Sequence, residues 1–144
     1  MPVGQQVDPF RAYNFKLYFK GEAWAQFTEV SGLNVRVDVI RYREGGSRAV
    51  RCIPGQLYYG DVTFRYGLTS SPQLWNWFQG SVRGEVERLN VTIGLLDAAA
   101  SDEVMRWNLN AAWIAEWSGA VLSAKSRELA IESMTLVYDE LNRE

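Results

Sequence analysis

The residues that could carry acid–base chemistry in this chain are carboxylates in two short stretches. Asp97, Asp102 and Glu103 fall within one predicted turn, and Glu85 and Glu87 stand two positions apart. A catalytic carboxylate pair needs a fold that shifts the pKa of one member away from that of the other. Charged residues in turns are ordinarily solvated, and this turn lacks the spaced oxygen ligands of a calcium loop. We therefore interpret both stretches as hydrated surface, with no catalytic or metal-binding role.

Nucleophilic chemistry has little support in the composition. The chain contains no histidine and a single cysteine, Cys52. The absence of histidine removes the commonest general base, the histidine-activated nucleophiles and most zinc sites. We expect Cys52 to be a small, half-buried hydrophobic residue, and the glycines at 44–47 precede no lysine or helix that would make a phosphate loop. The sequence predicts no enzyme, no cofactor and no small-molecule substrate.

Aromatic residues offer one further binding chemistry. Trp75, Trp77 and Phe78 would make a platform for a sugar if they shared one exposed face. Their spacing is helical, and an apolar stripe at that spacing usually packs on a core. Hydroxyl residues and a proline at its start, and Gly84 at its end, predict a helix over residues 71–83.

Alternation of apolar and polar residues predicts that the rest of the chain is mainly strands. Such segments occur at residues 13–19, 23–30, 33–43, 61–66, 89–95, 105–117 and 129–138. The glycine-rich residues 44–60 read as a long loop with room for one short strand. We predict one domain over residues 1–144, with an N-terminal extension at 1–9. Its fold is an antiparallel β-barrel or sandwich with the helix on the outside.

The net charge and the distribution of apolar residues limit the partners and the cellular compartment that we expect. The 144 residues carry a net charge of −2, which gives no electrostatic case for a nucleic-acid partner. No apolar stretch approaches the roughly 20 residues of a membrane-spanning helix. The first ten residues lack a basic region followed by an apolar run, so we expect no signal peptide and folding in the cytoplasm.

The long strand at 33–43 changes faces partway along. Val35, Val37 and Val39 share one parity, whereas Ile40 and Tyr42 have the other. A switch of parity requires a bulge, a bend or a change of environment. We interpret the valine half as covering the core of this domain and the other half as contacting a neighbouring subunit. A β-bulge within a monomeric barrel is the alternative. The last predicted strand shows a second switch, between its residues 131 and 134.

Five stretches in this order carry a family resemblance over residues 8–141. They are DPFRAYNFKLYF, FTEVSGLNVRVDVIRYREGG, PGQLYYGDVTFRYGLTSSPQLWNWF, VTIGLLDAAASDEVMRWNLNAAWIAEWSG and ELAIESMTLVYDEL. Each stretch is weak alone, but the ordered set is specific. The chain resembles the contractile-tail tube family, which comprises myovirus tail-tube proteins and the inner-tube proteins of extracellular contractile injection systems. The match is closer to the injection-system type, although these motifs do not separate the two.

The resemblance implies a mechanical function. Six subunits of such a protein join strands into one continuous β-barrel ring, and rings stack into a tube within a contractile sheath. Contraction drives the tube through a target envelope, and the lumen holds cargo, a tape-measure protein or DNA. The implied partners are further copies of the chain, the sheath protein, the baseplate or tube initiator, and cap proteins. The protein would be assembled in the bacterial cytoplasm as part of a phage tail or tail-like particle.

The resemblance and the face switch together give a set of candidate contact residues. The inter-subunit or inter-ring candidates are Val39, Ile40, Arg41, Tyr42, Arg43, Glu44, Arg48, Arg51, Tyr58, Tyr59, Met134 and Leu136. Arg36 and Asp38 are candidates for lining the lumen. The predicted loop at 44–60 would contact the adjacent subunit or the next ring. A further hypothesis is that Arg41, Arg43 and Arg48 pair with Glu44, Asp61 or Glu29 and set the register between rings.

Two rival functions remain open from the sequence. One is a baseplate-proximal tube initiator, a paralogue of the same fold that often carries an extra module. The other is a monomeric β-barrel that binds a carbohydrate or lipid through its tryptophans. Assembly into rings separates the tube protein from the monomeric binding module.

Overall fold

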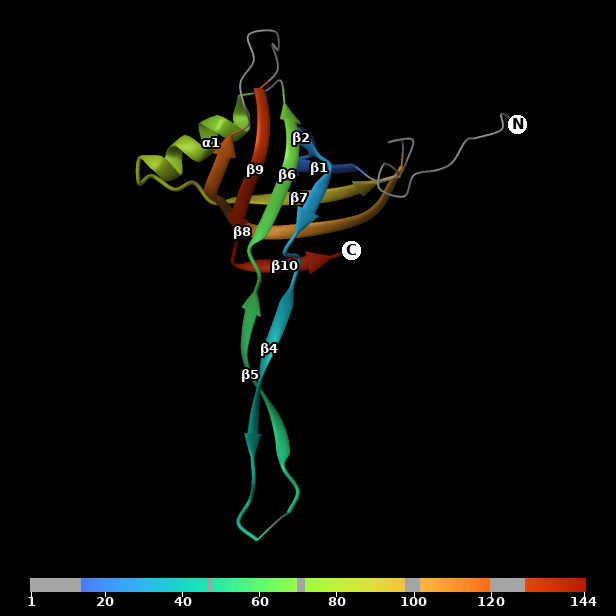
Figure 1. Cartoon of the computed structure of the whole chain (residues 1–144), viewed down its shortest axis with the longest axis vertical. Helices are drawn as coiled ribbons and strands as arrows, with labels where there is room; N and C mark the ends of the chain where they lie inside the picture. The colour runs from blue at the N-terminus through green and yellow to red at the C-terminus, as the bar shows by residue number, and fades with distance from the viewer. Residues whose placement is uncertain (1–13, 47, 70–71, 98–101, 120–128) are drawn as a thin grey trace, which may run out of the picture.

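The computed structural model describes residues 14–46, 48–69, 72–97, 102–119 and 129–144. Figure 1 shows a body of strands and one helix, from which a long two-stranded hairpin projects. The strands of the body are β1 (Asn14–Phe19), β2 (Glu22–Phe27), β3 (Glu29–Ser31), β6 (Val62–Thr69), β7 (Leu89–Leu96), β8 (Glu103–Gly119), β9 (Leu129–Val137) and β10 (Glu140–Arg143). The hairpin is made by β4 (Val35–Tyr42) and β5 (Arg51–Tyr59), and the helix is α1 (Gln73–Val82). The predicted extension at 1–9 lies outside the described residues.

The strands of the body close into an antiparallel barrel, as predicted. β1 pairs with β2 and β7, β6 pairs with β2 and β9, and β8 pairs with β7 and β9. Closure depends on the 17 residues of β8, whose first half pairs with β7 and whose second half pairs with β9. β3 continues the pairing of β2 along β6, and β10 continues that of β9 along β8. A closed barrel leaves no open edge in its wall.

The strands β5 and β10 were not predicted from the sequence. Residues 51–59 are not part of a loop but form β5, a nine-residue strand that pairs with β4. This strand was missed because Pro54 and Gly55, both unfavourable in strands, lie between its apolar residues Ile53 and Leu57. The four-residue strand β10 was not predicted, because its sequence is too short to show alternation. A two-residue turn joins β1 and β2, and Lys20 and Gly21 both have positive φ, as a type I′ turn requires.

The second face switch is a bend in the barrel wall. In β6, Tyr66 has φ +56° and is 64% exposed, and the strand changes which parity it buries at that residue. The neighbouring strand β9 follows the same bend, so that Ile131 and Met134 are both buried although they differ in parity. Met134 and Leu136 are fully buried in the core of their own chain. The prediction that these two side chains face another subunit is therefore wrong.

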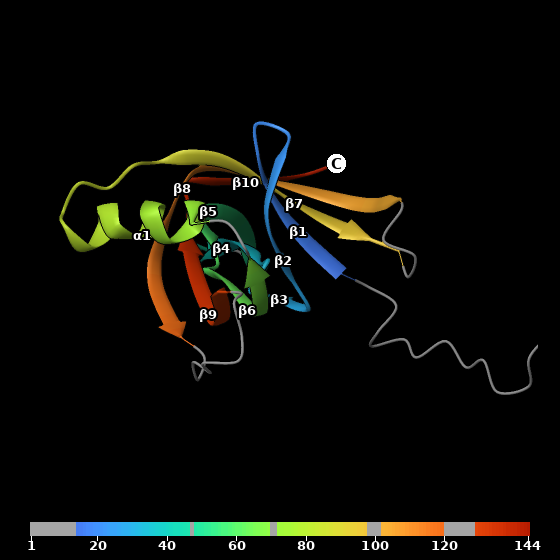
Figure 2. The same cartoon turned by 90° about the horizontal axis from the view of Figure 1, so that it is seen from above.

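The helix α1 packs on the outside of the barrel, as expected (Figure 2). Leu74 and Trp77 are buried, and Gly84, with φ +78°, ends the helix. The Glu85 N–H donates to the Gly80 carbonyl at 2.8 Å, which completes the usual hydrogen-bonding pattern of a glycine-terminated helix. The start differs from the prediction, because the N-cap is Pro72 and it makes no side-chain capping bond. In the described part of the chain, no helix has the length and apolar character needed to cross a membrane.

Candidate assembly surface

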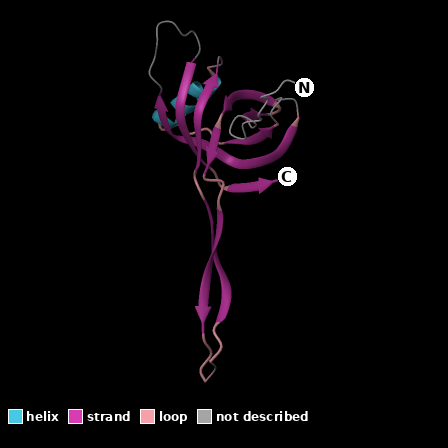
Figure 3. Ribbon diagram, turned by 45° about the vertical axis from the view of Figure 1, so that its right-hand side comes forward, coloured by secondary structure: helices cyan, strands magenta, loops and turns pink. Residues whose placement is uncertain are grey.

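The hairpin of β4 and β5, here called the arm, stands away from the body (Figures 1 and 3). Its apolar side chains are exposed: Val35, Val37, Val39, Ile40, Tyr42, Val50, Ile53, Leu57 and Tyr58. Val35 and Ile40, which belong to opposite parities, are each 52% exposed. The prediction that the valine half of the strand covers the core of its own domain is therefore wrong. Both halves of β4 present apolar surface to the outside.

The two faces of the arm follow from its register. Val35 and Val37 stand opposite Tyr59 and Leu57, and Ile40 stands opposite Ile53. A bulge between these two regions gives β5 one more residue than β4. The first set lies on one face of the ribbon, near the body, and the Ile40–Ile53 pair lies on the other face, near the tip. The change of parity in the sequence therefore corresponds to a change in which face of the exposed ribbon carries the apolar side chains.

The arm is also twisted along its length. The two strands cross in projection partway along the arm in both Figure 1 and Figure 3, so the ribbon turns over between its base and its tip. Two-stranded ribbons twist more strongly than wide sheets. The apolar residues also change faces along the arm, so exposed apolar side chains occur both near its base and near its tip. These exposed apolar side chains of the arm are here called the apolar stripe.

The opposite face near the base is polar. Arg36 lies 3.4 Å from a carboxylate oxygen of Asp38, and its guanidinium stacks 4.8 Å from the centre of the Tyr58 ring. A hydrogen bond to Asp38 and the charge of that carboxylate raise the pKa of the Tyr58 hydroxyl. Exposed ion pairs of this kind contribute little to stability, so the cluster marks a hydrated face. Arg36 and Asp38, the candidates for lining a lumen, belong to this face.

The tip of the arm is basic. Arg41, Arg43, Arg48 and Arg51 are all exposed and lie near one carboxylate, Glu44. The Tyr42 hydroxyl donates to Glu44 at 2.8 Å, and this hydrogen bond raises the pKa of Tyr42. The tip therefore has a charge of +3 whereas the whole chain has −2, so the rest of the chain carries −5.

The base of the arm is held by close backbone contacts. The Gly60 N–H donates to the Asn34 carbonyl at 2.8 Å, and the Asn34 N–H donates to the Gly32 carbonyl at 2.7 Å. Gly32 has φ +89°, and a Cβ there would overlap the carbonyl oxygen of Asp61. From the body, the Tyr138 hydroxyl donates to the Gly60 carbonyl at 2.6 Å. These contacts fix the direction in which the arm leaves the barrel.

The structure brings ten of the twelve contact candidates together on the arm. Of these, Tyr59 is half-buried, with its ring 5.8 Å from that of Tyr138, and the other nine are exposed. Cys52, expected to be half-buried, is also exposed on the arm, opposite Arg41. Glu29, proposed as a partner in another ring, lies 3.3 Å from Arg65 of its own chain.

Sequence reasoning missed five apolar residues of this surface: Val35, Val37, Val50, Ile53 and Leu57. The first two showed the alternation of a half-buried strand, and that pattern does not reveal whether the covering layer belongs to the same chain. The last three lay in the segment predicted as a loop. Across the described residues, no group of three or more His, Cys, Asp or Glu side chains could hold a metal ion.

Comparison with known proteins identifies the family. The family model described as T4-like virus tail tube protein gp19 matches residues 11–142. The chain belongs to this tail tube family. A search of curated proteins found no match. The match spans the barrel, the arm and the helix, so all three are parts of the tail tube fold.

Solved structures show the same fold. A chain in the sheath–tube complex of the extracellular contractile injection system PVC, in its extended state, matches with a TM-score of 0.69 and 23% identity. That match covers 99% of this chain and 93% of the other. A chain in the anti-feeding prophage tube-terminating cap matches with a TM-score of 0.69 and 23% identity, covering 100% and 94%. Hcp1 from Flavobacterium johnsoniae matches with a TM-score of 0.50 and 14% identity, covering 90% and 93%.

Proposed function

We propose that this protein is the inner-tube subunit of a contractile injection system or phage tail. Six copies form a ring and the rings stack around a lumen that carries cargo, a tape-measure protein or DNA. Contraction of the sheath then drives the tube through a target envelope. The tail tube family and the tail tube fold support this role. The protein acts mechanically and not as an enzyme, and it is assembled in the bacterial cytoplasm.

The exposed arm is the observation that carries the proposal. A hairpin with apolar residues along its length is costly in water unless another surface covers it, and large exposed apolar patches mark interaction sites. Both outer edges of the hairpin are unpaired in the described structure, because β4 and β5 pair only with one another. Neighbouring subunits would cover the stripe and supply partners for these edges. The polar face with Arg36 and Asp38 would then look toward water, in the lumen or on the outer wall.

The partners follow from this role. They are further copies of the chain, a sheath, a baseplate or tube initiator, and a cap. The solved relatives come from a sheath–tube complex, a tube-terminating cap and a baseplate. The baseplate-proximal initiator is the second candidate, because a relative of similar fold occurs in the baseplate structure at 24% identity.

Size-exclusion chromatography followed by negative-stain electron microscopy tests the proposal. The purified protein is expected to elute as a ring or larger assembly and to show annular or tubular particles of uniform width. Protein that stays at rings when its concentration is raised, and lengthens only on a preformed baseplate, would favour the initiator. A stable monomer at all concentrations that binds glycans would overturn the proposal in favour of a binding module.

A further inference from the structure

Four neighbouring strands of the body present one polar face to the outside, here called the hydroxyl face. They are β3, β6, β9 and the second half of β8, in that order across the sheet. The register aligns their outward side chains in two rows. The first row is Ser31, Thr63, Thr135 and Glu116, and the second is Glu29, Arg65, Ser133 and Ser118. Five of these eight residues carry only a short hydroxyl side chain.

The hydroxyl face has few groups that could hold another molecule. The hydroxyls of Thr63 and Thr135 lie 3.2 Å apart and bond to one another. Neither row contains an aromatic or a large apolar side chain. Binding energy at protein surfaces comes mainly from such anchors, so this face suits passage better than retention. The two rows end where the next paired residues, Trp113 and Val137, are half-buried.

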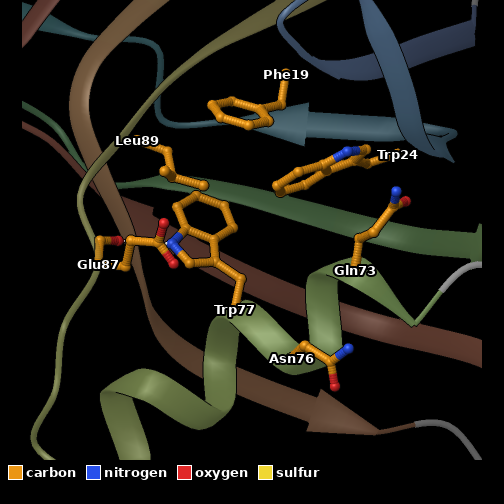
Figure 4. Close-up of a pocket in the computed structure, with 7 residues that line it drawn as sticks. All are labelled: Phe19, Trp24, Gln73, Asn76, Trp77, Glu87 and Leu89. Carbon is orange, nitrogen blue, oxygen red and sulfur yellow. Dashed lines mark hydrogen bonds between the residues drawn. The ribbon is translucent and has the colours of Figure 1, made fainter.

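The helix α1 lies on the opposite side of this sheet. Trp117 of β8 pairs with the buried Met134 and has the opposite parity from the residues of the two rows. Its ring stacks on that of Phe78 in α1, with 5.7 Å between the ring centres. Farther along, Trp77 points from α1 toward Trp24 of β2, with 5.9 Å between their ring centres (Figure 4). The helix therefore covers the core side, and the hydroxyl face looks away from it.

Both edges of the four-stranded sheet run past the closed part of the barrel. On one side, the pairing of β8 with β7 ends at Ala112, and residues 113–119 pair only with β9. On the other side, β3 pairs only with β6 among the described strands. Strands of neighbouring copies can continue such edges. In the proposed ring of six copies, the inner wall would then have four strands from each copy, with α1 on the outer side.

The number of strands determines the width of this wall. Strands lie about 4.8 Å apart and tilt by about 35–45° in barrels, so about 24 strands enclose about 45–52 Å between opposite backbones. A folded domain of about 100 residues has a radius of gyration of about 13 Å. A lumen of this width therefore admits an unfolded chain or a small folded domain.

The charge of the hydroxyl face indicates the class of cargo. Arg65 lies 3.3 Å from a carboxylate oxygen of Glu29, and this pair is neutral. Glu116, and Glu132 beside Ser133, are exposed and make no ion pair within the described residues. The face therefore has a charge of −2 in each copy. A negative lumen repels the phosphates of a nucleic acid and attracts the basic segments of a polypeptide.

We propose that the hydroxyl face lines the lumen and that the cargo it contacts is a positively charged polypeptide. This inference rests on the proposed tube function. It adds the residues that face the lumen and the class of the cargo. Arg36 and Asp38, the candidates from the sequence, lie on the arm and outside the two rows.

Thiol accessibility in assembled tubes tests the position of the face. In a Cys52→Ser background, Ser118→Cys places a thiol on the hydroxyl face, and Val82→Cys places one on α1, where the native side chain is 63% exposed. A small maleimide should label both thiols in tubes. A maleimide carried on a gold particle wider than the lumen should label Ser118→Cys about tenfold more slowly than Val82→Cys, because the closed wall excludes the particle. Dissociated subunits should react equally at both sites.

Three outcomes would contradict the proposal. Equal particle labelling of the two thiols, in protein that forms tubes, would overturn the position of the face and leave the proposed function standing. Ser133→Cys repeats the measurement on the central strand β9. If the small maleimide reaches neither Ser118→Cys nor Ser133→Cys in tubes, the face lies in a contact between copies and the assignment is overturned. Failure of the unmodified protein to form rings or tubes would overturn the proposed function and the lumen face with it.

Charge reversal tests the class of cargo. Glu116→Lys changes the hydroxyl face, and Glu85→Lys is the matched control, because Glu85 is also exposed but follows the end of α1. Tubes are mixed at low salt with a fluorescent lysine-rich peptide or a single-stranded oligonucleotide and are then sedimented. Unmodified tubes should retain the peptide and leave the oligonucleotide in solution. Glu116→Lys should lower peptide retention by about tenfold and Glu85→Lys by less than about twofold, because screening confines each charge to its own surface.

Two results of the sedimentation would overturn the class of cargo. One is retention of the oligonucleotide in preference to the peptide by unmodified tubes. The other is an equal loss of peptide in the two variants, which would place the bound peptide outside the lumen. Electron microscopy of each sample ensures that only assembled tubes are compared.

Discussion

The Tyr138 hydroxyl donates a 2.6 Å hydrogen bond to the carbonyl of Gly60, the residue that follows the last strand of the arm. Tyr138 belongs to the end of the chain and lies between β9 and β10, so this bond joins the barrel wall to the arm across 78 residues of sequence. Its ring also packs on Tyr59. The bond and the ring contact hold the arm in one direction before any partner is present.

Removal of this hydroxyl should weaken the base of the arm. Tyr138→Phe keeps the ring but leaves the Gly60 carbonyl without its donor. We expect a loss of about 1 kcal/mol in the free energy of unfolding, the usual net value of one hydrogen bond. Urea denaturation followed by tryptophan fluorescence measures it, with Tyr66→Phe as the control because that side chain is 64% exposed. Equal losses in the two variants would contradict the role of Tyr138.

Stability at high pH should report on the same hydroxyl. Burial, with Asp61 and Tyr59 as lesser causes, raises the pKa of Tyr138 from 10.0 to about 12. The neutral form is therefore favoured in the folded protein, and its contribution is fully present below pH 10 and is lost as pH rises from about 10 to 12. A difference of this size corresponds to about 2.7 kcal/mol in full. Solvent screening at this half-buried site reduces the expected loss to about 1 kcal/mol. The loss in that interval should be smaller in Tyr138→Phe, and an identical pH profile would contradict the assignment.

Two glycines with positive φ should respond differently to alanine. Gly32 and Gly46 have φ +89° and +84°, but only at Gly32 would a Cβ overlap backbone, the Asp61 carbonyl. Gly46→Ala should cost about 1–2 kcal/mol, the strain of a left-handed alanine. Gly32→Ala should cost about 1–3 kcal/mol more, because the base of the arm must also shift. Thermal denaturation compares them, and similar melting temperatures would show that the base tolerates displacement.

Sequence patterns predicted the barrel more accurately than they predicted the contact surface. Most of the strands and the end of the helix depend on local chemistry that a short window contains. An apolar stripe is a contact surface only if the layer that covers it belongs to another chain. The local alternation of residues is the same whether that layer comes from the same chain or from another. Val35 and Met134 show this in opposite directions. The valine was assigned to the core and is exposed, whereas the methionine was assigned to an interface and is buried.

The bend at Tyr66 explains the misassigned methionine. A positive φ in β6 turns the wall, and β9 must turn with it because the two strands pair along most of their length. The parity change that the sequence shows between residues 131 and 134 therefore corresponds to a bend shared with the neighbouring strand, and residues 129–138 alone do not show that both halves face the same core. The second strand of the arm was missed for a different reason, since Pro54 and Gly55 interrupt the alternation of β5.

The last prediction compares a substitution in the core with a substitution on the arm. Met134→Ala removes a fully buried side chain and should lower the free energy of unfolding by about 2–5 kcal/mol. Val39→Asn, at a half-exposed position of the arm, should change the stability of the subunit by no more than about 0.5 kcal/mol, as surface substitutions usually do. The arm variant should nevertheless assemble poorly, because it interrupts the apolar stripe that neighbouring subunits cover. Val104→Asn is the matched control, since Val104 is similarly exposed but lies on β8. Denaturation and size-exclusion chromatography on the three variants measure both effects. Normal assembly of Val39→Asn, or impaired assembly of Val104→Asn, would show that the stripe is not the contact surface.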